Sequence, residues 1–427
     1  MRSLKFAFIL MLLLFPLIIL PSSMLILSPN QLKSTAITIK SENGVSGYEI
    51  PQSVTYDVEI NFSLTHSAGG NGDYWFKFSR LDDRQPNSSL TQYSGPYQES
   101  ELQYSSITGS DPTPLIYRDR FNNTFDVFNA TDLLPAETIT LNQRYQVKLN
   151  EVYFNNIIPS EIGVYDTSDD IFALYCNNSE LYYERDYVNI STKSYEIVNP
   201  SDNPVVKAQK IYDWVVNHLE YGEGLPAQEM GAKWAYDNQL GDCSEYSSLM
   251  VTLLRCQGIP ARKVGGFVIS NDPTTKPYIG QEWNFYTRSV GGSNILGHAW
   301  VEYYVPNIGW IACDPTWDEQ VNYFNHIDYL RFNFNIGAWF SIPRLNDTSE
   351  FPHPCIVYIT SSVFDYDYNF KVIVVDVNLE PFTLDLEIII FIIIGVILAA
   401  LVVGITIVIV RSRKKRKRFK ETNYSDY

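Results

Sequence analysis

The sequence predicts an α+β protein that has a β-rich N-terminal domain and ends in a transmembrane helix. Apolar and polar residues alternate from Val54 to Thr65, which is the period of a half-buried strand. Apolar residues recur at helical spacing from Ala208 to Leu219, and strand-like segments follow. An uncharged apolar run extends from Ile388 to Val410, and a helix needs about 20 such residues to cross a bilayer.

Length and composition limit the classes of protein that remain. The chain has 427 residues, so two or three domains are expected rather than one core. Aromatic residues make up 14% of the chain, which argues against disorder over most of its length. The formal net charge is −16, which argues against nucleic acid as a partner.

These patterns predict six segments. They are a signal peptide or signal anchor at 1–28, a β-rich, sandwich-like extracytoplasmic domain at 30–160, an α+β domain at 190–345, a short β-containing membrane-proximal segment at 346–385, a transmembrane helix at 387–410 and a basic cytoplasmic tail at 411–427. The β-rich domain contains no group of residues with catalytic spacing.

The two apolar runs predict the topology. Arg2 and Lys5 precede the first run, as in a secretory signal or an uncleaved signal anchor. A cluster of Arg and Lys follows Val410, and such a flank stays on the cytoplasmic side of a membrane. The expected localisation is therefore the cell membrane, with one span, an extracytoplasmic main body and a cytoplasmic C-terminus. Sequons such as Asn61-Phe-Ser add weak support for export and a glycoprotein.

Cys243 is the candidate nucleophile. Asp242 and Glu245 have the spacing of a capping box, which places Cys243 at the first position of a helix that stops before Gly258. A helix N-terminus lowers the pKa of a thiol. The Cys243 backbone N–H there is free to help hold an oxyanion. The alternative is an ordinary buried or disulfide-bonded cysteine.

His298 and Asp314 are the candidate base and orienting group. Pro306 separates two strand-like segments, which predicts a β-hairpin. With the turn centred on Pro306, His298 faces Asp314 across the ladder and Trp300 faces Ala312. The carboxylate then fixes the tautomer of the imidazole. A slip of one residue in the register would separate the two side chains.

The remaining cysteines are expected to lie away from this site. The chain has five cysteines, and an odd number in an exported protein suggests one free thiol. Cys256 lies about 20 Å along the predicted helix from Cys243. Cys313 neighbours Asp314 and points to the other face of the hairpin. Both are interpreted as core residues or as bridge partners.

Together these motifs resemble the transglutaminase-like superfamily, whose fold is papain-like. The matching segments are 241–246, 253–255 with 258–262, 298–302, and 309–310 with 314–316. The resemblance implies a catalytic triad of Cys243, His298 and Asp314, and it leaves Trp234 as a candidate oxyanion donor. Family members include cross-linking transamidases, peptidases, amidases and relatives that have lost activity. No cofactor or metal is expected, and neither calcium dependence nor glutamine specificity is carried over.

The sequence therefore predicts a membrane-anchored, extracytoplasmic thiol enzyme. It would transfer acyl groups from protein or peptide amides to water or to an amine, as a peptidase, an amidase or a transamidase. The first alternative is a cell-surface binding or adhesion ectodomain that uses the same fold as a scaffold without catalysis. The second is a structural domain in which Cys243 is disulfide-bonded.

Overall fold

The computed structural model describes residues 47–109, 115–177, 179–222, 225, 229–317, 321–337, 355–358, 363–379 and 386–422. The chain divides into two compact units, residues 1–379 and 380–427. The predicted signal segment at 1–28 lies outside the described residues.

A six-stranded sheet dominates the first unit, with the order β12-β11-β18-β1-β6-β3. Its strands are β1 (Ser53–His66), β3 (Gln98–Thr108), β6 (Thr138–Asn150), β11 (Glu282–Arg288), β12 (Gly292–Ser293) and β18 (Phe364–Asn378). β1 pairs along its length with β6 on one side and with β18 on the other. Buried and more exposed residues alternate along β1, as the sequence period predicts.

A second sheet lies against this one and has the order β17-β2-β5-β4. It consists of β2 (Gly72–Ser79), β4 (Leu115–Arg118), β5 (Thr124–Leu133) and β17 (Cys355–Tyr358). Residues of both sheets form one apolar cluster, in which Phe62 of β1 meets Phe78 of β2 with ring centroids 4.8 Å apart. The segment predicted to be membrane-proximal thus contributes β17 and β18 to the two sheets of the β-rich region.

Between residues 170 and 337, the described part of the chain supplies five helices and a third sheet. The helices are α2 (Asp170–Tyr175), α3 (Val188–Ile197), α4 (Pro204–His218), α5 (Gly231–Asn238) and α6 (Cys243–Cys256). The sheet has the order β14-β13-β10-β16 and consists of β10 (Ala261–Val268), β13 (Gly297–Val305), β14 (Gly309–Cys313) and β16 (Arg331–Gly337). Short elements complete the unit: β7 (Val152–Tyr153) with β15 (His326–Ile327), β8 (Glu220–Tyr221) with β9 (Leu240–Gly241), and a 3₁₀ turn η2 (Pro159–Glu161).

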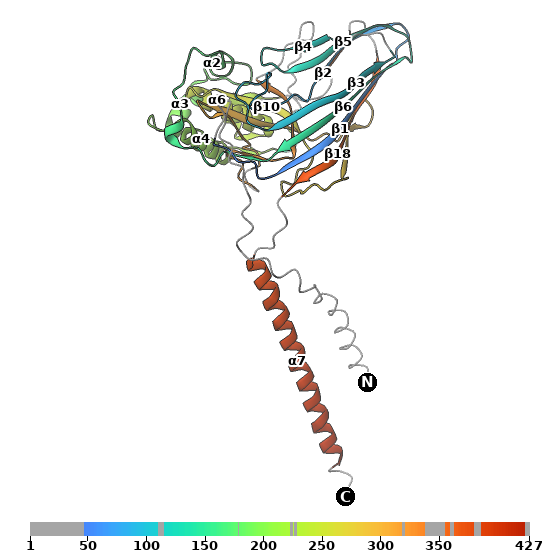
Figure 1. Ribbon diagram of the computed structural model, residues 1–427, viewed down its shortest axis with the longest axis vertical. Coiled ribbons are helices and arrows are strands. Elements are labelled where there is room, and N and C mark those ends of the chain that lie inside the picture. The colour runs from blue at the N-terminus through green and yellow to red at the C-terminus, as the bar shows by residue number, and fades with distance from the viewer. Residues whose placement is uncertain are drawn as a thin grey trace. The chain divides into compact units, whose positions relative to one another are not determined.

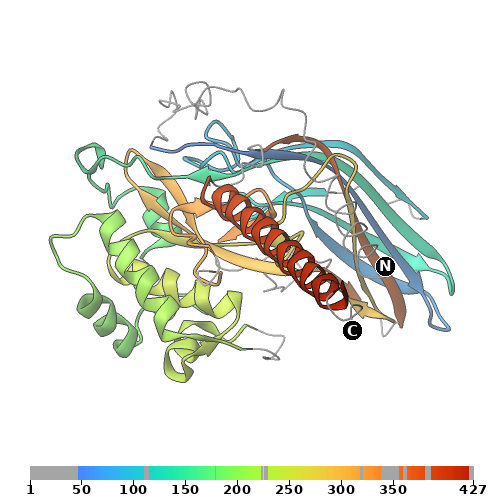
Figure 2. The ribbon, with the colours of Figure 1, turned by 90° about the horizontal axis from the view of Figure 1, so that it is seen from below.

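The third sheet joins the helical side of the unit to the β-rich side (Figure 1). Figure 2 shows its orange strands between the green helices and the blue strands of the large sheet. Met250 of α6 and Val301 of β13 belong to one apolar cluster, whereas Phe267 of β10 and Phe370 of β18 belong to the other. Every residue of β10 and β16 is buried, as expected for strands that are covered on both faces. The predicted α+β class is confirmed.

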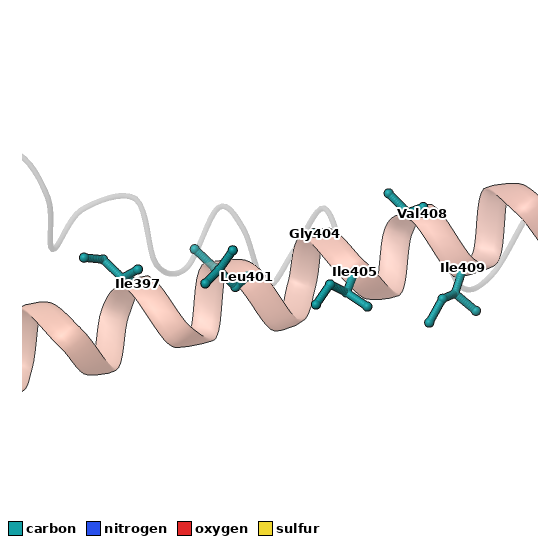
Figure 3. A pocket seen from close by; sticks show the side chains of 7 residues that line it. Ile397, Leu401, Gly404, Ile405, Val408 and Ile409 are labelled. Carbon is teal, nitrogen blue, oxygen red and sulfur yellow. The ribbon is translucent and has the colours of Figure 1, made fainter.

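The described residues of the second unit form the helix α7 (Leu386–Thr422). Its apolar side chains form a shallow groove around Gly404, lined by Ile397, Ala400, Leu401, Ile405, Val408 and Ile409 (Figure 3). Among the residues that the structure describes, no helix has the length and apolar character that crossing a membrane requires. The transmembrane helix at 387–410 is therefore not confirmed and stays a prediction.

Candidate functional site

The start of α6 has the predicted cap. Asp242 is the N-cap residue, and its side chain accepts a hydrogen bond from the Ser244 N–H at 2.8 Å. The Glu245 carboxylate accepts from the Asp242 N–H at 3.1 Å, which completes the capping box. The helix ends at Cys256, and Gly258 follows with φ +70°, a conformation that suits glycine. Cys243 is thus the first residue of the helix.

The Cys243 thiol is buried and free. Its residue is 8% exposed, and Cys176, Cys243, Cys256 and Cys313 are all unbridged. The alternative of a disulfide-bonded Cys243 is therefore wrong, as is the interpretation of Cys256 and Cys313 as bridge partners. Cys256 donates from its thiol to the Arg185 carbonyl at 3.6 Å, and the Cys313 sulfur lies 3.9 Å from the Met250 sulfur. Both contacts fit core positions.

The acidity of Cys243 differs from the expectation for a helix N-terminus. Burial, followed by the charge of Asp242, raises the pKa of the thiol far above its ordinary value, and Asp314 adds to the rise. The Ala299 backbone N–H and the charge of Lys263 lower the pKa only in part. The thiol is therefore neutral at neutral pH, because desolvation and two carboxylates disfavour the thiolate.

The hairpin exists, but the predicted register is wrong by two residues. Val305 pairs with Gly309 and Glu302 pairs with Ala312, so the turn is centred on Asn307 rather than on Pro306. Asn307 has φ +66°, and a three-residue loop with one left-handed residue shifts the pairing. Since side chains alternate with a period of two, this shift keeps His298 and Asp314 on the same side of the ladder. They meet diagonally instead of directly.

His298 and Asp314 are hydrogen-bonded. The Nε2 atom of His298 lies 2.6 Å from Asp314 Oδ2, and both side chains are buried. Asp314 Oδ1 accepts from the Thr316 N–H at 3.1 Å. Burial opposes ionisation of Asp314, but the charges of His298 and Arg331 outweigh it and lower the pKa of this carboxyl to about 2. An ionised carboxylate therefore holds one nitrogen of the imidazole.

The thiol lies beside the strand that carries the histidine. The Ala299 N–H, which interacts with the Cys243 sulfur, belongs to the residue directly after His298 in β13. Among the described residues, no hydrogen bond joins the Cys243 sulfur to the His298 ring, and none engages the Nδ1 atom of His298. The structure thus brings Cys243 next to the backbone of β13 and leaves the second ring nitrogen unengaged.

Trp234 lies on α5 and is half-buried. Its backbone carbonyl accepts a hydrogen bond from the Asn238 side chain at 2.8 Å. Within the described part of the chain, the Trp234 indole makes no hydrogen bond or ring contact with Cys243, His298 or Asp314. Its role as an oxyanion donor stays a prediction.

Two further charged groups near the site could not be predicted from the sequence. Arg331 of β16 contacts Asp314 with two nitrogens, at 3.0 Å and 3.2 Å. Lys263 of β10 forms a buried ion pair with Glu229, which also accepts from the Ser248 hydroxyl of α6. Neither group belongs to a local motif, because strand pairing rather than sequence spacing brings them to the site. No group of three or more potential metal ligands occurs among the described residues.

Comparison with known proteins points to one family. Residues 191–315 match a family model described as the transglutaminase-like superfamily. A protein-glutamine gamma-glutamyltransferase of Pseudomonas aeruginosa is 33% identical over 105 residues, which are 24% of this chain and 14% of that protein. YebA, an uncharacterized protein of Bacillus subtilis, is 34% identical over 84 residues, which are 20% of this chain and 10% of that protein. The chain thus spans less than one sixth of the length of these two curated relatives.

A solved structure is similar over a longer stretch. It is a proposed cysteine protease from Cytophaga hutchinsonii, with a TM-score of 0.48 and 16% sequence identity. The match covers 78% of this chain and 96% of that one.

Proposed function

Residues 191–315 form a domain of the transglutaminase-like superfamily, and from this premise we propose that the chain is a thiol enzyme of acyl transfer. Cys243 is the nucleophile, His298 is the base and Asp314 orients the base. The substrates are protein or peptide amides. The observation that carries the proposal is the buried His298–Asp314 hydrogen bond, beside a free thiol at the start of a helix.

The first half of the reaction forms a thioester. The thiol is neutral, so its proton passes to Nδ1 of His298 as the sulfur attacks the amide carbonyl carbon. The imidazolium that forms is stabilised by the Asp314 carboxylate, which contacts Nε2. The tetrahedral intermediate then collapses, the carbon–nitrogen bond breaks, and His298 returns the proton to the departing amine. The backbone N–H of Cys243, at the start of α6, is suited to the oxyanion.

The second half of the reaction releases the acyl group. His298 takes a proton from an incoming water or amine, which attacks the thioester carbonyl. The carbon–sulfur bond then breaks, and the departing sulfur takes that proton back from His298, which restores the neutral thiol and imidazole. Water gives a carboxylic acid and an amine gives a new amide. We favour hydrolysis of peptides. A product analysis with and without a primary amine decides this point, because only a transamidase would incorporate the amine in competition with water.

Substitution of the nucleophile tests the proposal. Cys243→Ala should reduce turnover of a peptide library by about 1000-fold or more. Cys256→Ala is the matched control, because it removes a buried thiol from the other end of the same helix and should leave turnover nearly unchanged. Thermal unfolding of both variants monitors the fold. Equal turnover of the wild-type protein and Cys243→Ala would refute the assignment.

The rival is a binding ectodomain that uses the fold without catalysis. The raised pKa of the Cys243 thiol and the lack of a described hydrogen bond between sulfur and imidazole favour it. Mass spectrometry distinguishes the two functions, because an enzyme forms an acyl-Cys243 adduct with its substrates and a scaffold does not.

We also propose that the enzyme is anchored in a membrane with its main body outside the cytoplasm. The support is the apolar run from Ile388 to Val410 and the basic cluster that follows it. Protease added to intact cells should then remove the body of the protein and spare an epitope tag at the C-terminus. Protection of the body would contradict this topology.

A further inference from the structure

Four buried charged or ionisable side chains form a row that runs from His298 through Asp314 and Arg331 to Asp328. Arg331 is in contact with Asp314 on one side and with Asp328 on the other, where Nη1 lies 2.5 Å from Asp328 Oδ2. Asp328 also accepts from the Leu330 N–H at 2.9 Å and from the Tyr323 hydroxyl at 2.5 Å. His298 completes the row through its hydrogen bond to Asp314.

Aromatic rings hold the guanidinium of Arg331 in place. The ring of Tyr323 lies 4.2 Å from it and the ring of Trp317 lies 4.6 Å from it. The Trp317 ring also packs against His298, with centroids 5.5 Å apart. Since the Arg331 and Asp314 side chains are 0% exposed, water does not screen the charges in this row.

The charges in the row are unequal in number. Two carboxylates face one guanidinium, so the row has a net charge of −1 while His298 is neutral and becomes neutral when His298 takes a proton. Removing one partner of a buried ion pair leaves the other without compensation, which is costly. The row is therefore balanced in the state in which His298 is an imidazolium, and that is the state formed when the thiol attacks.

We propose that Arg331 and Asp328 are positioning residues that set the charge and orientation of the Asp314–His298 pair. Arg331 fixes the Asp314 carboxylate with two N–H donors, and Asp328 neutralises Arg331 so that Asp314 remains available to the imidazolium. This role rests on the proposed function, because it requires His298 to gain and lose a proton during turnover.

Other charged and ionisable groups that act on the site lie on the elements around the row. Cys243 lies at the start of α6 beside its N-cap residue Asp242, and Lys263 lies in β10. The charges of Asp242 and Lys263 both act on the Cys243 thiol. Asp242 and Lys263 remain unchanged in the experiment below, and Cys243 is replaced only in the NMR measurements, in the same way in every variant. A difference between variants at Arg331 and Asp328 therefore reports on the row itself.

The test uses two substitutions that change the charge of the row in opposite directions. Arg331→Gln removes a positive charge, so His298 should take up its proton at a higher pH. Asp328→Asn removes a negative charge, so His298 should take up its proton at a lower pH. The expected displacement is about 0.5 pH unit or more in each direction. Arg331→Lys keeps the charge and loses the two-nitrogen contact, so it should lower kcat with little displacement.

Two readouts follow these variants in the full chain. The acid limb of the pH dependence of kcat/KM should move with the proton affinity of His298. In the Cys243→Ala background, NMR of histidine-labelled protein follows the His298 ring directly, with His298→Gln to assign its signal. The NMR readout needs no activity, so it remains informative even if the proposed function fails.

Displacements of opposite sign support the proposal. Displacements of the same sign, or none in either variant, overturn it, because a merely structural role gives no dependence on the sign of the charge. Thermal unfolding shows whether each variant is folded. If Arg331→Gln does not fold, Asp328→Asn and Arg331→Lys decide the question. Failure of the proposed function is recognised separately, by unchanged turnover in Cys243→Ala.

Discussion

Asp242 has two opposite effects on the neighbouring thiol. Its carboxylate caps α6 through the Ser244 N–H and so places Cys243 at the first helical position. The same negative charge raises the pKa of the Cys243 thiol, second only to burial. Asparagine caps helices about as well as aspartate and carries no charge, so substitution separates the two effects.

Asp242→Asn should therefore make Cys243 more reactive. Loss of the neighbouring charge lowers the pKa of the thiol, so the thiolate fraction at any pH below that value rises. We expect several-fold faster alkylation by iodoacetamide between pH 7 and 9, with the rate still increasing with pH in both proteins. Mass spectrometry of the Cys243 peptide measures the rate.

Asp272→Asn serves as the control, because Asp272 lies in an exposed turn. It should leave the rate unchanged. A slower reaction of Asp242→Asn than of the wild-type protein, with an unchanged unfolding temperature, would contradict the electrostatic account of the thiol.

At the scale of elements, β10 lies very close to its two neighbours in the third sheet, β13 and β16. Gly266 pairs with His298 of β13 and with Asn333 of β16, next to a shift in register. A Cβ atom at Gly266 would lie 1.8 Å from the Phe332 carbonyl oxygen and 3.0 Å from the Trp300 ring. Glycine is therefore required where the strand that carries His298 meets its neighbour.

Gly266→Ala should push β16 away from β10 and destabilise the fold. Forcing a methyl group into a packed core lowers the free energy of unfolding by about 1–3 kcal/mol. Here the atom in the way is a backbone carbonyl oxygen, which cannot move without its strand. A lower thermal midpoint and loss of the His298–Asp314 geometry are expected, measured by calorimetry and by turnover. Gly69→Ala is the control, since nothing lies within 4 Å of a Cβ atom there. Equal stability of the two variants would contradict the close approach.

The elements also show which contacts can be predicted from sequence. The cap of α6 and the alternation along β1 depend on residues close in the chain, and both are predicted correctly. The hairpin register depends on the left-handed conformation of Asn307. The sequence does not specify that conformation, so the predicted pairing is wrong by two residues. The contact of Arg331 with Asp314 depends on a strand order that no local pattern specifies.

At the scale of the whole molecule, the β-rich region completes the sheet that carries the site. β14 and β16 are the edge strands of that sheet. The Tyr97 hydroxyl accepts from the Ala312 N–H of β14 and donates to the Trp310 carbonyl. The Gln98 side chain accepts from the Asn333 N–H of β16 and donates to the Asn333 carbonyl. The Asn123 side chain does the same for the Ile336 N–H and carbonyl of β16. Unpaired edges template aggregation, and here side chains from the β-rich region bind both edges.

A buried ion group joins the same two regions. Glu302 of β13 is 0% exposed and accepts from Arg262 of β10 at 2.7 Å. It also accepts twice from Arg84, which lies between β2 and β3, at 2.7 Å and 2.8 Å. Burial opposes ionisation, but these two charges keep the pKa of Glu302 below its ordinary value. Without Arg84, the buried Glu302 carboxylate keeps only one of these two arginine partners. Breaking a buried ion pair in this way costs about 3–5 kcal/mol of stability.

Residues 190–345 expressed alone should therefore not form a stable domain. They retain Glu302 and both edge strands but lack Arg84, Tyr97 and Gln98, so they should lack a cooperative thermal transition by circular dichroism and should associate. Residues 47–379, which keep these contacts within one compact unit, should unfold in a single transition. Arg84→Met in that longer chain should lower its midpoint while the transition remains cooperative. A cooperative transition of residues 190–345 at the midpoint of the longer chain would show that the β-rich region contributes nothing to the stability of the sheet.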